Sequence, residues 1–211
     1  MVFLGWVLGM VSIWITEGVK NWKNRVETDR AIQTELNELR LKLLCSIYLL
    51  RMRLGTFDRN LLNWMVPLIE RYQGSHVPDP IVARLQDLAA LDDARIQDAV
   101  TVHAQSTSQQ GLTLKKYTVP YLEAKMSQLG TFSEPKQSAL FSIKAHMDLL
   151  NQEIEAARRY ADKTFDSTIT TDNHAKILNN VMTRYQYAAE GAETVVHLIN
   201  KLDQIRNREW V

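Results

Sequence analysis

The chain contains few of the residues that interrupt helices or build covalent frameworks. Its 211 residues include 8 glycines, 5 prolines and one cysteine. Because glycine and proline punctuate strands and turns, their scarcity excludes a fold of many short strands and favours long helices. The lone cysteine, Cys45, excludes an internal disulfide and a thiolate metal cluster. It lies in an apolar run, so we expect a buried thiol in a reducing compartment.

The sequence also lacks an excess of either charge. Lys plus Arg total 25 and Asp plus Glu total 24, which gives a formal net charge of +1. A protein that neutralises a phosphate backbone needs many more basic than acidic side chains. No nucleic-acid partner is therefore expected.

Motifs that carry catalysis, a metal or a nucleotide are missing as well. None of the five histidines has a second histidine three or four residues away, and the glycine-rich phosphate-binding and nucleophile motifs do not occur. We therefore predict a non-enzymatic protein with no cofactor, no metal site and no small-molecule ligand. The alternative is an enzyme whose site is assembled from scattered residues near the C-terminus: Glu190, Glu193, His197 and Asp203.

What the sequence does contain is an apolar N-terminus. Residues 1–16 read MVFLGWVLGMVSIWIT, without a charge or a proline. Such a run must be buried in protein or lipid, and a spanning helix needs roughly 20 apolar residues, with about 17 as the lower end. The run reaches this length only if the helix continues to Trp22, so we predict a transmembrane anchor at residues 1–22. Burial as a core helix is the alternative.

The residues that flank the apolar run indicate an orientation. Trp14 and Trp22 are suited to the membrane interface. Lys20, Lys23 and Arg25 follow the run, whereas no basic residue precedes it. This asymmetry places the C-terminal bulk in the cytoplasm. The prediction is a single-pass protein, with the bacterial inner membrane as its expected location.

The helical pattern continues beyond the anchor. From Ile32 to Leu54, apolar residues recur at spacings of three and four, which predicts one long helix that ends at Gly55. A second helix is expected within residues 57–73, packed in the core or returned to the membrane surface. Asp79 and Pro80 are a strong start signal for a third helix, which is expected to continue to about residue 105.

The C-terminal part has the clearest periodicity. Two segments carry apolar residues at alternating spacings of three and four, which is typical of a heptad seam. A short polar turn at 166–172 separates them, so they are predicted to form a long antiparallel hairpin. The seam residues are Leu140, Ile143, Met147, Leu150 and Ile154 in the first arm, and Ile177, Val181, Tyr185, Val195, Ile199 and Leu202 in the second.

These patterns predict an all-α chain in which an N-terminal transmembrane helix continues into a cytoplasmic helical bundle with a long C-terminal hairpin. The expected parts are an anchor (1–22), a juxtamembrane helix and first helical part (23–105), a linker (106–117), and a short helix plus hairpin (118–211). The leading hypothesis is a membrane-anchored scaffold that binds partner proteins or itself in contact with the lipid bilayer. The alternative is a membrane-perturbing effector, toxin-like or defensive, that oligomerises through the G-x-x-x-G pair Gly5 and Gly9.

Overall fold

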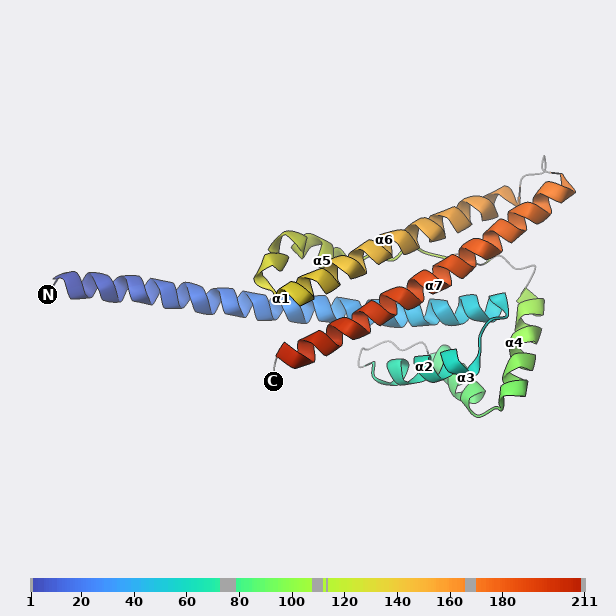
Figure 1. The fold of residues 1–211 in the computed structure, drawn as a ribbon, viewed down its shortest axis with the longest axis horizontal. Helices are drawn as coiled ribbons and strands as arrows, with labels where there is room; N and C mark the ends of the chain where they lie inside the picture. The colour runs from blue at the N-terminus through green and yellow to red at the C-terminus, as the bar shows by residue number, and fades with distance from the viewer. Residues whose placement is uncertain (1, 73–78, 108–111, 113, 166–169, 210–211) are drawn as a thin grey trace.

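The fold is described from a computed structural model. It describes residues 2–72, 79–107, 112, 114–165 and 170–209, and within these it describes the backbone alone at 2–13, 79 and 207–209. All regular structure in these residues is helical (Figure 1). The predicted all-α class is confirmed.

The longest element is α1 (Val2–Leu54), a single helix of 53 residues. At 1.5 Å per residue it is about 80 Å long. Two backbone hydrogen bonds close its C-terminal end, from the Gly55 N–H to the Met52 carbonyl at 3.2 Å and from the Thr56 N–H to the Arg51 carbonyl at 2.9 Å. Gly55 has a φ of 71°, which glycine adopts without strain. The predicted continuous helix and its end at Gly55 are confirmed.

The C-terminal half of α1 forms the centre of a helical bundle. From Ile32 to Met52 its apolar side chains, except the exposed Leu49, are largely buried, and they lie on more than one face of the helix. Because no single neighbour can cover several faces, helices from four other parts of the chain contact α1: α2 (Arg59–Glu70), α4 (Asp93–Thr107), α5 (Pro120–Lys125) and α7 (Thr171–Glu209).

The N-terminal half of α1 projects from this bundle (Figure 1). Every residue from Trp14 to Arg25 is exposed. The alternative of a core helix is therefore wrong for residues 14–25. We call this exposed stretch, residues 14–25, the projecting segment.

The predicted transmembrane anchor at residues 1–22 is not supported by the structure. Among the residues whose side chains are described, which on α1 begin at Trp14, no helix is long and apolar enough to cross a membrane. The physical reason is that Glu17 and Lys20 interrupt the apolar residues of the projecting segment. The side chains of the charge-free run at 2–13 lie outside the described part of the chain.

α2 packs into the bundle. Its N-cap is Asp58, whose carboxylate accepts the Leu61 N–H at 2.8 Å. Leu62, Met65 and Ile69 are buried on its inner face. The inner face of α2 is thus packed in the core, which is the first of the two arrangements expected for residues 57–73. Contact of its outer face with a membrane stays a prediction.

The single helix expected from Asp79 to about residue 105 is wrong, because the structure contains two helices there. They are α3 (Asp79–Ala89) and α4, separated by a turn. The Asp92 carboxylate accepts the Arg95 N–H at 2.8 Å, which is the hydrogen bond of a helix N-cap. Arg59 of α2 also donates to two backbone carbonyls around this turn. A local cap and a tertiary contact together end α3.

The described part of the predicted linker lies against the bundle. Leu114 is buried, and so is Val119, two residues beyond the end of the predicted linker. The Tyr117 N–H donates to Asn151 at 2.9 Å, and its hydroxyl is hydrogen-bonded to Ser46. α5 and the short 3₁₀ helix η1 (Met126–Thr131) then form the predicted short helix. The division of the chain into four parts stays a prediction.

α6 (Glu134–Lys163) and α7 form the predicted antiparallel hairpin (Figure 1). Ser133 occupies the N-cap of α6, as its sequence indicates. Except for Ile177, which is partly exposed, the predicted seam residues are buried. Residues 166–169 of the expected turn lie outside the described chain. The hairpin seam is therefore filled within one molecule.

Candidate functional site

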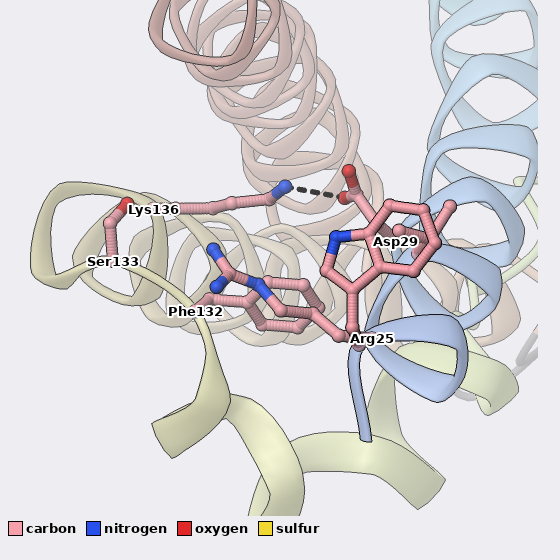
Figure 2. A pocket seen from close by; sticks show the side chains of 7 residues that line it. Arg25, Asp29, Phe132, Ser133 and Lys136 are labelled. Carbon is pink, nitrogen blue, oxygen red and sulfur yellow. Dashed lines mark ion pairs between the residues drawn. The ribbon is translucent and has the colours of Figure 1, made fainter. Parts of the chain in front are cut away.

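An open cavity of about 400 Å³ lies where α1 leaves the bundle (Figure 2). The end of the projecting segment and the start of the hairpin meet at this point. The cavity is lined from α1 by Trp22, Arg25, Val26 and Asp29, from the chain between η1 and α6 by Phe132 and Ser133, and from the first turn of α6 by Lys136.

An ion pair joins the two walls of the cavity. Lys136 Nζ lies 2.6 Å from Asp29 Oδ1, and the two side chains are 4% and 13% exposed. Among the described residues, Lys136 is the one charged residue that is fully buried. A buried charge is strongly destabilising unless it is paired. The pair therefore fixes the first turn of α6 to α1.

Two cations lie over the ring of Phe132. Lys136 Nζ is 4.7 Å from the ring centroid, and the Arg25 guanidinium carbon is 5.8 Å from it. Figure 2 shows the Arg25 guanidinium above this ring. Both distances fall within the range of cation–π attraction. With the Asp29 carboxylate as the one acidic group in the lining, the cavity carries an excess of one positive charge.

Hydrogen bonds from the neighbouring elements hold the Phe132 wall in place. The Phe132 N–H donates to the Leu129 carbonyl at 2.9 Å, and the Gln137 side chain donates to the Phe132 carbonyl at 2.8 Å. Further back, the Glu35 carboxylate of α1 accepts two N–H groups at the start of α5, each at 2.8 Å. The cavity is thus formed by fixed groups on three elements.

An apolar face of the projecting segment leads into the cavity. Ile15, Val19, Trp22 and Val26 recur at spacings of four, three and four, so they lie on one side of α1. We call these four residues the projecting stripe. Ile15, Val19 and Trp22 are 56%, 60% and 62% exposed, and the adjacent Trp14 is 79% exposed. Because Trp22 and Val26 also line the cavity, stripe and cavity form one continuous surface.

Comparisons with known proteins found no match to this chain, either among family models, among curated proteins or among solved structures. The functional argument therefore rests on the geometry of this chain.

The basic residues predicted to flank a membrane differ in their surroundings. Lys20, Lys23 and Arg25 are all exposed. Lys23 lies 3.9 Å from Glu27, one turn further along the helix. Of the three basic residues, Arg25 is the one that lines the cavity. Gly5 and Gly9 lie where the structure describes the backbone alone.

The residues of the enzymatic alternative are not brought together. Glu193 pairs with Arg51 at 2.7 Å, which raises the pKa of that guanidinium, and Asp203 pairs with Arg40 at 2.7 Å. His197 stacks on the Trp64 ring instead, with 4.8 Å between the ring centroids. These contacts join α7 to α1 and α2. In the described part of the chain, no group of three or more His, Cys, Asp or Glu is placed to hold a metal.

Cys45 is half-buried and free, in the packed half of α1. Desolvation by burial raises the pKa of its thiol. The thiolate is therefore disfavoured, which is the chemistry expected of a packing residue.

Of the seven lining residues, Trp22 and Arg25 were predicted from the sequence as interfacial residues. The other five were not predicted as site residues: Val26, Asp29, Phe132, Ser133 and Lys136. One signal was present. Lys136 stands four residues before Leu140 on the apolar side of α6, where a charged residue needs a buried partner. The identity of that partner is not visible in the sequence, because Asp29 belongs to a distant element.

Proposed function

We propose that this protein is a membrane-tethered helical assembly module. In this proposal the N-terminal part of α1 inserts into a lipid bilayer, and the bundle binds partner proteins or a second copy of the chain. The observation that carries the proposal is the exposure of the projecting stripe together with Trp14. Fully burying one large apolar side chain is worth about 1.5–3 kcal/mol, so this surface favours an apolar environment.

Two features favour lipid over a protein groove as that environment. A helix that binds in a groove needs one apolar face, whereas residues 2–13 contain no charged side chain at any position. Tryptophan is also enriched at the boundary between hydrocarbon and headgroups, and Trp14 and Trp22 follow the run at that place. Eight residues separate them, which is about 12 Å along a helix.

The basic residues of the projecting segment support an orientation. Lys20, Lys23 and Arg25 lie beside the tryptophans on the bundle side of the run. Basic residues near a membrane are retained on the cytoplasmic side and are attracted to anionic lipids by about 1 kcal/mol each. We therefore place the bundle in the cytoplasm, at the surface of a bacterial inner membrane.

The hairpin supports the assembly part of the proposal. The hairpin seam is filled by its own side chains, but the outer faces of the hairpin carry large apolar side chains that are exposed to solvent. Their exposed fractions are 48% for Phe141, 56% for Leu149, 45% for Leu178 and 46% for Tyr187. Phe141 and Leu149 are eight residues apart, so they lie on one side of α6. These faces are where we expect a partner helix or a second copy to pack.

Vesicle flotation of the full-length chain tests the tether. The wild-type protein is expected to float with phosphatidylcholine vesicles. Leu8→Lys places a charge in the apolar run, which costs about 2.5–3.5 kcal/mol in a bilayer and lowers partitioning roughly 100-fold. Leu178→Lys, an equivalent change on the hairpin, serves as the matched control and is expected to leave flotation unchanged.

Failure of the wild-type chain to float, or an equal loss in both variants, would contradict the tether. Release of a dye from the same vesicles would favour the membrane-perturbing alternative over an assembly module.

A further inference from the structure

We propose that the cavity at the base of the projecting segment binds a phosphate group through Arg25 and Lys136, and that an anionic phospholipid presents it. This inference rests on the proposed function and deepens it, because it names the headgroup chemistry that the protein recognises. Phosphatidylcholine also has a phosphate, but its choline cation balances the charge, so a site with one excess positive charge favours anionic lipids. This selectivity adds to the diffuse attraction of the basic residues.

The cavity has the charge and the size for this ligand. Two cationic groups and one carboxylate line it, so one positive charge is left to balance an anion. Its volume of about 400 Å³ falls within the usual range of ligand pockets, roughly 300–1,000 Å³. A phosphate with part of its ester group fits a space of this size.

The hydrogen-bond donors of the site are positioned before a ligand arrives. The ring of Phe132 holds the Arg25 guanidinium by a cation–π contact, which uses none of its N–H donors. Lys136 has three donors on Nζ, and the bond to Asp29 uses one of them. Because the planar guanidinium fork matches phosphate geometry, Arg25 is the residue expected to dominate binding.

The position of the cavity along α1 favours a lipid source for the phosphate. Trp22 is part of the cavity lining, and Arg25 follows it by three residues, about 4.5 Å along the helix. If the indole of Trp22 lies at the headgroup level of a bilayer, as tryptophans tend to do, the cavity opens at the depth of the phosphates. Ile15 and Val19, the part of the projecting stripe that precedes Trp22, then lie on the side of the acyl chains.

The test compares two single charge removals on the same helix. Arg25→Gln removes the cavity arginine, and Arg30→Gln removes an exposed arginine that does not line the cavity. Binding of each full-length variant is measured to phosphatidylcholine vesicles with and without phosphatidylglycerol. We expect Arg25→Gln to lower the preference for the anionic vesicles by about 30-fold or more, and Arg30→Gln by about 5-fold or less.

Both substitutions remove an exposed side chain, so both variants are expected to keep the wild-type circular dichroism spectrum and urea midpoint. Equal losses of anionic preference in the two variants would overturn the site, because diffuse attraction would then explain all of the binding. The tether itself is tested separately by neutral vesicles, to which Arg30→Gln, outside the cavity, is expected to bind as the wild-type does, whereas Leu8→Lys is expected to lose this binding.

A second experiment, in solution without vesicles, distinguishes a lipid phosphate from free phosphate. Inorganic phosphate at millimolar concentration is titrated into the wild-type chain and both variants by calorimetry. Weak or undetectable binding, together with the 30-fold effect on vesicles, supports a lipid phosphate. Saturable binding that Arg25→Gln abolishes and Arg30→Gln retains, without an effect on vesicles, overturns the lipid source and assigns a free phosphate to the cavity.

Discussion

The two halves of α1 share one continuous backbone and similar apolar spacings, but they differ in what surrounds them. Between Ile32 and Met52 most apolar side chains are buried by other helices, whereas every residue from Trp14 to Arg25 is exposed. Apolar periodicity therefore shows which residues share a helix face. It does not show what covers that face, which depends on the rest of the chain or on a partner.

The difference also shows how the projecting segment can be helical although all of its residues are exposed. Starting a helix is unfavourable because several residues are fixed for one hydrogen bond, whereas extending an existing helix adds a bond for each residue fixed. The packed half of α1 supplies the nucleus, and the projecting segment continues from it. We therefore expect substitutions in the two halves to affect the free energy of unfolding very differently.

The largest effect is expected at the junction of the two halves. Asp29→Asn leaves Lys136 buried without a carboxylate, and we expect the free energy of unfolding to fall by about 3–5 kcal/mol. The matched control is Glu155→Gln in the Lys116–Glu155 pair, whose side chains are 48% and 51% exposed, and its expected loss of stability is far smaller because water screens this pair. Urea unfolding followed by circular dichroism measures both. Similar losses in the two variants would show that the Asp29 pair is as well solvated as a surface pair.

The next largest effect is expected when one apolar side chain is truncated in each half of α1 and the changes in unfolding free energy are compared. Leu43 has no exposed surface, so Leu43→Ala is expected to lower the free energy of unfolding by about 2–5 kcal/mol. Trp14→Ala removes a larger side chain, but in water its effect is expected to stay within about 0.5 kcal/mol, because Trp14 is 79% exposed. The same urea titration, without lipid, provides the measurement. A loss above about 1 kcal/mol for Trp14→Ala would mean that the projecting segment packs against the bundle.

The smallest effects on the free energy of unfolding are expected for alanine substitutions at two helical glycines, one in the hairpin and one in the projecting segment. A Cβ at Gly191 would lie 3.6 Å from Leu150, an ordinary contact, so Gly191→Ala is expected to raise the free energy of unfolding by about 0.5–1 kcal/mol. Gly18→Ala meets nothing within 4 Å and gains the same helix propensity. It should increase helicity while changing the unfolding free energy by less than about 0.5 kcal/mol. An equal gain in unfolding free energy would mean that the projecting segment unfolds together with the core.

Much of the fold could be predicted because it depends on local patterns. The end of α1 follows from Gly55, and the hairpin follows from two segments with the same periodicity. The break between α3 and α4 was missed, although Asp92 is a good N-cap residue, because a tertiary contact from Arg59 also holds that turn. An N-cap residue within a continuous apolar pattern does not by itself show that one helix ends there and another begins. In this chain the contact from Arg59 also holds the turn.

The candidate site was harder to predict from the sequence than the fold. Its walls come from α1 and from the start of α6, and the sequence does not show that these two elements meet. Arg25 was predicted as an interfacial residue, but its contact with Phe132 depends on tertiary structure. Composition alone also does not show whether residues 1–22 lie in lipid or in the protein core, because an apolar run is consistent with both. The exposure of residues 14–25 excludes the core for that stretch.

Hydrogen exchange along α1, measured by mass spectrometry with and without phosphatidylcholine vesicles, tests the central claim most directly. Without vesicles, we expect the amides of residues 14–25 to exchange much faster than those of residues 36–50, because every residue of the projecting segment is exposed. Addition of vesicles should slow exchange in residues 14–25 and leave residues 36–50 unchanged. Exchange in residues 14–25 that is the same with and without vesicles would contradict the membrane tether.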